Sequence, residues 1–134
     1  TAAVLSFFLE RRESLEESGI DPSRLLFDPG IGFGKRVKDN LELIRNIDAF
    51  HRVGRPIYIG TSRKSFLSSV LDQPQADRDL ATVIVNCMAL IHGANVLRVH
   101  DVAKTVMLSR LHSAVFELPP APGASTPIPI ERGV

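Results

Sequence analysis

The chain has 134 residues, of which 44% are hydrophobic and 23% are charged, a composition that predicts one globular domain and excludes a disordered, collagen-like or coiled-coil chain. The 16 Lys and Arg residues almost balance the 15 Asp and Glu residues, and this balance does not predict a nucleic-acid partner. The single Cys87 excludes an internal disulfide and predicts a reducing, cytoplasmic compartment, and no apolar run approaches the ~20 residues needed to span a bilayer.

The first predicted element is a helix over residues 3–18 that Gly19 ends. Its apolar positions already repeat at helical spacing in the first residues, and the chain begins with Thr. We therefore expect the start of this helix, as part of a longer polypeptide, to lie before residue 1. The short apolar run 25–27 then predicts a strand, which ends at Asp28 because the following Pro and Gly cannot continue a ladder.

A second helix follows the glycine-rich stretch 30–35. Asp39 and Glu42, three residues apart, resemble a capping box, and Gly54 ends the segment. Its expected apolar face consists of Leu41, Leu43, Ile44, Ile47 and Phe50.

The same order of elements then recurs twice. Residues 57–59 predict a strand, and a short helix from Phe66 breaks near Pro74. A longer helix is expected from about 77 to 92, where Gly93 ends it, followed by a strand at 96–99. Side chains expected inside this helix are Leu80, Val83, Ile84, Cys87, Leu90 and Ile91.

A final helix is predicted from Val102 to about Leu118, with Asp101 as its cap. Residues 119–134 contain five prolines and no apolar periodicity, so we expect a Pro-rich flexible tail. The expected organisation is a folded segment 1–118 and a tail 119–134.

Three strand–loop–helix units spaced by roughly 30–40 residues predict an α/β fold with a parallel sheet, because each crossover is helical. A doubly wound sheet and a (β/α)8 barrel both satisfy this pattern. In either fold the functional groups are expected at the carboxyl ends of the strands.

The loop after the first strand reads Asp-Pro-Gly-Ile-Gly-Phe-Gly-Lys over residues 28–35. Pro29 and Arg36 rule out a P-loop, and Lys35 stands where the dinucleotide-binding spacing requires glycine. The Asp28 carboxylate could accept two N–H bonds from a 2-amino-pyrimidinone edge. Alternatively, Asp28 only initiates a turn.

The loop after the second strand, residues 60–65, places two cations among three hydroxyls at the start of a helix. That set suits an anion or a carbonyl-bearing heterocycle. The alternative is a helix cap with solvated charges.

The third strand end carries Arg98 and His100, which strand alternation places on one face, opposite Leu97 and Val99. A guanidinium there requires an anionic or aromatic partner, and a diphosphate would supply one. An acidic residue of the fold could also pair with it. The remaining histidines are scattered, so no metal-ligand spacing and no metal site is predicted among these residues.

In this order and spacing, the stretches DPGIGFGK, GTSRKSF and RVHD resemble the dihydropteroate synthase family, over the chain from the first helix to about residue 118. The resemblance implies the last three βα units of a TIM (β/α)8 barrel. It also implies a transferase of folate biosynthesis, a sulfonamide target that joins p-aminobenzoate to 6-hydroxymethyl-7,8-dihydropterin diphosphate and releases diphosphate. The implied cofactor is Mg2+, with its ligand expected outside this segment.

The resemblance also implies roles for individual residues. Asp28 would hold the pterin edge, Gly60 would allow the pterin close to the backbone, and Lys64 would bind its carbonyl side. Arg98 would stack on the pterin and, with His100, grip the diphosphate. Lys64, Arg98 and His100 are thus the implied catalytic residues. The implied aminobenzoate-binding residues are Phe33, Thr61, Ser62, Arg63 and Ser65.

Because only three of eight strands are expected, we predict that the chain alone is inactive or nearly so. Its first strand should expose an unpaired edge, which predicts a homo-oligomer or association with the missing part of the barrel. Expected ligands are small molecules, without a nucleic-acid or membrane partner. The alternatives are a pterin-dependent methyltransferase, a non-catalytic remnant or assembly module, and a generic phosphate-binding barrel half. The stretches GTSRKSF and RVHD argue against the methyltransferase, because a methyl carrier has no diphosphate to expel.

Overall fold

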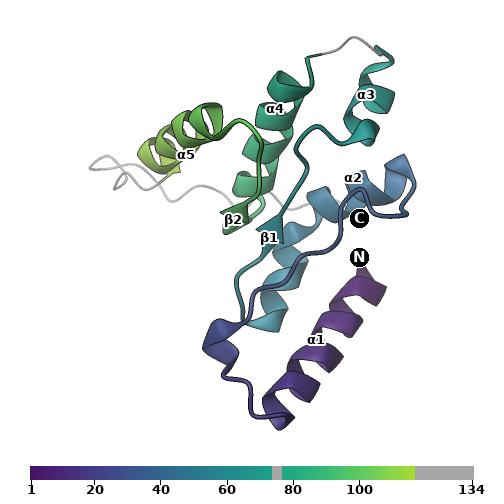
Figure 1. Cartoon of the computed structure of the whole chain (residues 1–134), viewed down its shortest axis with the longest axis vertical. Coiled ribbons are helices and arrows are strands. Elements are labelled where there is room, and N and C mark those ends of the chain that lie inside the picture. Colours follow the sequence, from purple (N-terminus) through teal and green to yellow (C-terminus); the bar gives the residue numbers. More distant parts are fainter. Residues whose placement is uncertain (74–76, 117–134) are drawn as a thin grey trace, which may run out of the picture.

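A computed structural model describes residues 1–73 and 77–116, and the predicted tail 119–134 lies outside these residues. The described helices and strands, shown in Figure 1, are α1 (Ala2–Glu17), the 3-10 helix η1 (Pro22–Arg24), α2 (Val37–Arg45), the 3-10 helix η2 (Ile47–Val53), β1 (Tyr58–Ile59), α3 (Ser65–Leu71), α4 (Arg78–Ile91), β2 (Val96–Leu97) and α5 (Val102–Phe116).

The sheet is parallel, as predicted. β1 pairs with β2, and Phe27 forms an isolated parallel bridge with Ile57 on the other side of β1. Backbone hydrogen bonds from Tyr58 N–H to Phe27 C=O and from Arg98 N–H to Ile59 C=O, both 2.8 Å long, join the three segments. The predicted strand 25–27 is thus reduced to one bridge, and β1 and β2 are shorter than expected. All three segments run in the same direction, so the loops that follow them lie at one edge.

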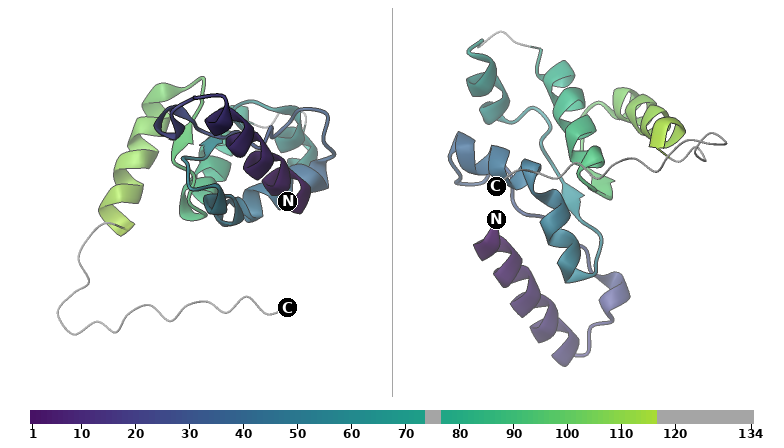
Figure 2. Two further views of the ribbon diagram at one scale, coloured as in Figure 1. Left: turned by 90° about the horizontal axis from the view of Figure 1, so that it is seen from below. Right: turned by 180° about the vertical axis from the view of Figure 1, so that it is seen from behind.

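The helices pack along these strands, with α1 and α5 on opposite sides of the molecule (Figures 1 and 2). The core is built from η2 and the strand residues, and its fully buried apolar side chains include Phe50, Ile57 and Ile59. Phe8 of α1 packs against Phe27 and Phe50, with ring centroids 4.9 and 5.5 Å away. This packing joins the first helix to the first strand segment.

Two predicted helix starts can be compared with the structure. Asp101 accepts the Lys104 backbone N–H at 3.0 Å and caps α5, as expected. For α2, the predicted pairing of Asp39 with Glu42 is wrong. The helix begins at Val37, and Asp39 instead accepts the Arg36 backbone N–H at 3.2 Å. Asp39 therefore stabilises the first turn from inside the helix.

The predicted interior face of α4 is also partly wrong. Leu80, Ile84 and Ile91 are 55%, 48% and 55% exposed in the described part of the chain. The side chains that α4 buries are Ala81, Thr82, Asn86 and Ala89. Small side chains let the helix approach its neighbours closely, whereas the larger apolar ones point outward. Among the residues described, no helix combines the length and apolarity needed to cross a membrane.

Candidate functional site

The loop 28–36 is held by a buried amide of the helix that follows it. Its three glycines all have positive φ, between 60° and 78°, which glycine adopts without a steric penalty. Asn40, only 1% exposed, accepts the Gly32 N–H at 2.6 Å. Its amide group also donates to the carbonyls of Lys35 and Arg36 at 3.3 and 3.1 Å. The loop is therefore folded back onto the start of α2.

Asp28 begins this loop and makes the turn that one reading of the sequence predicted. Its Oδ1 accepts the Gly30 N–H at 2.7 Å. The carboxylate is nevertheless exposed and retains further lone pairs, because an ionised carboxylate offers about four acceptor positions. A turn-forming role and a ligand-binding role are therefore compatible.

Lys64, from the second loop, reaches across the first. Its side chain lies so close to Gly32 that a Cβ there would overlap Lys64 Cδ. The ammonium donates a hydrogen bond to the Ile31 carbonyl, and Nζ lies 4.3 Å from the centroid of the Phe33 ring, a cation–π contact. The Lys64 side chain can therefore cross from the second loop to the first only because residue 32 has no Cβ.

The electrostatics of Lys64 show which charges gather around it. Partial burial lowers the pKa of its ammonium, the neighbouring Asp28 carboxylate raises that pKa, and Arg98 and Lys35 lower it. The structure thus brings together a carboxylate, an ammonium and a guanidinium from three successive strand ends.

The third loop contacts the second through Ser62 and His100. Ser62 Oγ lies 2.8 Å from His100 Nδ1 and accepts the His100 backbone N–H at 3.2 Å. Gly60 is buried, and a Cβ there would lie 3.8 Å from Arg98 Cβ, an ordinary contact. These contacts hold the loop that follows β1 against the segment that follows β2.

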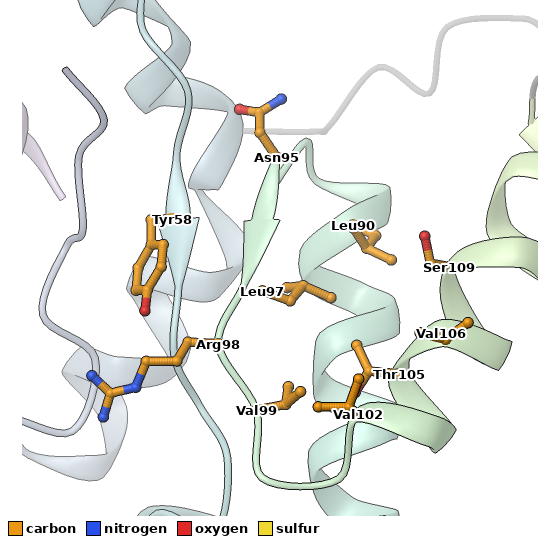
Figure 3. A pocket seen from close by; sticks show the side chains of 10 residues that line it. All are labelled: Tyr58, Leu90, Asn95, Leu97, Arg98, Val99, Val102, Thr105, Val106 and Ser109. Atoms are coloured by element: carbon orange, nitrogen blue, oxygen red, sulfur yellow. The ribbon is translucent and has the colours of Figure 1, made fainter. Parts of the chain in front are cut away.

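Figure 3 shows the predicted alternation along the third strand. Leu97 and Val99 point toward α4 and α5, whereas the Arg98 guanidinium extends to the other side, where Tyr58 of β1 also lies. A mainly apolar cavity of about 510 Å³ lies beside β2 on the helix side, and Arg98 and Tyr58 form part of its lining. Arg98 also belongs to the charged cluster around Lys64, but Asp28 and Lys64 do not line this cavity.

Two residues predicted for the aminobenzoate site face α4 instead. Thr61 is fully buried, and its hydroxyl donates to Asn86 Oδ1 at 2.7 Å. The Arg63 guanidinium makes two bonds to Asp79, at 2.7 and 2.9 Å, and holds the pKa of that carboxyl below its usual value. Both side chains therefore bond to α4 and connect the loop to that helix. Phe33, 62% exposed, and Ser65 remain accessible.

Sequence reasoning missed the residues that hold the loops. Asn40 and Asn86 are both 1% exposed, and Thr82 is 4% exposed. A signal was present, because Asn86 interrupts the otherwise apolar run 83–91. Among the residues that the structure describes, no group of three His, Cys, Asp or Glu side chains could hold a metal ion. The described residues therefore do not form a complete metal site.

The chain is similar in sequence to dihydropteroate synthases. The sequence profile of the pterin binding enzyme family matches residues 1–100. The dihydropteroate synthase of Haemophilus influenzae is 40% identical over 102 residues, covering 76% of this chain and 37% of that protein. That of Escherichia coli K12 is 35% identical over 115 residues, covering 86% and 41%. The chain thus spans about two fifths of the length of these relatives.

Solved structures agree with this similarity. A Xanthomonas albilineans dihydropteroate synthase in complex with 7,8-dihydropteroate has a TM-score of 0.82 and 37% identity, covering 88% of this chain and 47% of that chain. A Yersinia pestis dihydropteroate synthase with a sulfonamide drug has a TM-score of 0.80 and 33% identity, covering 85% and 42%. The described residues form three successive βα units of the TIM barrel that these enzymes share. The chain therefore belongs to the pterin binding enzyme family.

Proposed function

We propose that this chain carries the part of a dihydropteroate synthase site that holds the pterin diphosphate and borders the aminobenzoate. The observation that carries the proposal is that Lys64 reaches the first loop, where it contacts Ile31 and Phe33, while Gly60 of the same second loop lies against Arg98. The charges of Asp28 and Arg98 also act on the pKa of Lys64, in opposite directions. A carboxylate recognises an amino-pyrimidinone, and two cations suit a departing diphosphate.

In this proposal Asp28 accepts N–H bonds from the pterin edge with the lone pairs that Gly30 leaves free. Lys64 donates to the pterin carbonyl side. Its ammonium now bonds to the Ile31 carbonyl and lies over the Phe33 ring, so it is held at the loop junction before ligand arrives. The pterin is therefore proposed to lie beside Asp28 and Lys64, next to Gly60.

Arg98 and His100 are the proposed diphosphate ligands. As the bond between the pterin methylene carbon and the diphosphate oxygen breaks, negative charge grows on the leaving diphosphate. The arylamine nitrogen forms the new C–N bond and loses a proton. The Arg98 guanidinium would lower this barrier because it stabilises the charge that develops. Ser62 holds the His100 ring through the 2.8 Å contact with Nδ1.

The aminobenzoate position is proposed beside Phe33 and Ser65, which are exposed at the same edge. One support is a Xanthomonas albilineans dihydropteroate synthase structure with 4-aminobenzoic acid, at a TM-score of 0.82 and 37% identity. Mg2+ remains a proposed cofactor. Because the described residues form no complete metal site, no step above is assigned to it.

The experiment that tests this function is Arg98→Ala in an enzyme containing the complete barrel. Affinity for the pterin diphosphate should fall at least about tenfold, because a charge-assisted bidentate contact is lost. Affinity for the bare pterin should fall far less, because that ligand loses only the stacking of Arg98 on the pterin. Titration calorimetry measures both, with Arg110→Ala on α5 as the control. Equal losses for the two ligands would contradict the leaving-group role, and binding of methyltetrahydrofolate instead would favour a pterin-dependent methyltransferase.

We also propose that turnover in the cytoplasm requires the remainder of a barrel, whether it belongs to the same polypeptide or to an associated chain. Phe27 has a parallel strand partner on one side only within the described residues, and such an edge favours pairing. Light scattering of the 134-residue chain should show a homo-oligomer, and a stable monomer would count against self-association.

A further inference from the structure

One face of α4 carries a polar stripe where an apolar helix surface is expected. Asp79, Thr82 and Asn86 are spaced by three and four residues, so they lie on the same side of the helix. Thr82 and Asn86 are 4% and 1% exposed, although larger apolar side chains of the same helix are about half exposed. The helix therefore turns its polar positions inward.

All three side chains contact the loop that carries Ser62 and Lys64. Asn86 Oδ1 accepts the Thr61 hydroxyl at 2.7 Å, and Thr82 Oγ1 accepts the Arg63 backbone N–H at 3.1 Å. Asp79 binds the Arg63 guanidinium. Arg63 has a φ of 58°, a left-handed conformation that non-glycine residues seldom adopt. The contacts with α4 keep this residue in that conformation.

The Asn86 side chain has one bonded polar atom and one unpartnered polar atom among the described residues. Its Nδ2 is buried and has no hydrogen-bond partner within the described chain. A buried donor without a partner is unfavourable, and an apolar side chain of the same size would avoid that cost. The same substitution would leave the buried Thr61 hydroxyl without its acceptor, so the two effects on stability oppose each other.

The position of the loop decides where Ser62 lies, because Ser62 stands between the two anchored residues Thr61 and Arg63. Its hydroxyl meets His100 Nδ1 at 2.8 Å and also accepts the His100 backbone N–H. A shift of the loop away from α4 would separate the ends of β1 and β2. It would also displace Lys64, the next residue after Arg63.

We propose that Asn86 is a positioning residue. By accepting the Thr61 hydroxyl, it keeps the backbone of residues 61–63 where Ser62 engages the imidazole of His100 and Lys64 reaches the first loop. The effect on diphosphate binding rests on the proposed function, whereas the effect on the Ser62–His100 contact does not.

The test is Asn86→Leu in the full chain, with Cys87→Ala as a matched control on the same helix. Imidazole ¹⁵N chemical shifts at alkaline pH report which ring nitrogen of His100 carries the proton, and His100→Gln assigns the signal. In Asn86→Leu we expect a melting temperature close to that of the parent, because the unpartnered Nδ2 is removed while the buried Thr61 hydroxyl loses its acceptor. We also expect a mixture of the two His100 tautomers and several-fold weaker binding of inorganic diphosphate. Cys87→Ala should retain the parent spectrum and affinity.

A folded Asn86→Leu variant with the parent His100 spectrum would overturn the proposal. Thr61→Val removes the same bond from the loop side and should reproduce the spectral change if Asn86→Leu does not fold. Loss of folding in both variants, with Cys87→Ala folded, would assign the pair to stability alone and also overturn it. If His100 changes as expected but the parent chain binds no diphosphate, the positioning role stands and the proposed function fails.

Discussion

The loops 28–36 and 60–65 follow neighbouring parallel strands, and each is held by a buried asparagine. In the first loop Asn40 bonds to residues only four to eight positions away. In the second, Asn86 lies 25 positions from its partner Thr61. The first loop is thus closed by its own following helix, whereas the second depends on a helix that must first be docked.

The two loops also differ in how they turn. The first uses glycines at its positive-φ positions, where no Cβ is strained. The second places Arg63 in the left-handed region and secures it with Thr82 and Asp79. A loop can therefore obtain its shape from residue type or from tertiary contacts. Lys64 joins the two loops, so five substitutions can separate their contributions.

The largest effect is expected from Lys64→Ala, because this side chain belongs to the second loop and contacts the first. In an enzyme with the complete barrel, turnover should fall at least about 100-fold, since a preorganised donor is removed from a site where charge develops. Steady-state kinetics measure this, with the exposed Lys38→Ala as the control. Near-normal rates would remove Lys64 from the site.

Asn40→Leu should break the local support of the first loop. It removes the buried amide that accepts the Gly32 N–H and donates to the carbonyls of Lys35 and Arg36. The free energy of unfolding should fall by about 2–4 kcal/mol, from lost hydrogen bonds and unsatisfied groups. Urea denaturation measures it. A loss under about 0.5 kcal/mol, the range of ordinary surface substitutions, would show that the loop does not depend on Asn40.

Gly32→Ala and Gly34→Ala form a matched pair. Both positions have positive φ, so each substitution should lower the free energy of unfolding by about 1–2 kcal/mol. Only at Gly32 would the new Cβ collide with Lys64, because Gly34 has no neighbour within 4 Å. Calorimetry should therefore show weaker pterin binding for Gly32→Ala alone. Equal pterin affinities for the two variants would mean that the position of Lys64 does not depend on the absence of a Cβ at residue 32.

The smallest effect is expected from Asp79→Asn, which weakens the support of the second loop. Its hydrogen bond with Arg63 lowers the pKa of Asp79 below the usual 3.8. The pair therefore contributes stability above that value and loses it as the pH falls through the lower folded pKa. Thermal unfolding should show a small deficit for Asp79→Asn at pH 7 that disappears in acid. A deficit that persists unchanged at pH 2 would exclude the ion pair as its cause.

The sequence predicted the parallel α/β arrangement well, because strand, glycine and helix signals are local. It also placed Asp28, Lys64 and Arg98 at strand ends, which parallel topology brings to one edge. It failed for α4, where apolar spacing suggested that Leu80 and Ile84 were buried. Spacing shows which residues share a face, but it does not show which face meets the rest of the protein.

The sequence by itself determined the strand ends, the glycine loop and the family motifs, since each depends on residue type and near neighbours. Only the tertiary structure decided that Thr61 and Arg63 turn toward α4, that Lys64 crosses Gly32, and that Ser62 meets His100. These contacts join residues that are far apart in the chain. A buried polar group is stabilised by whichever partner packing brings within hydrogen-bond distance, so that partner can be identified only in the folded chain.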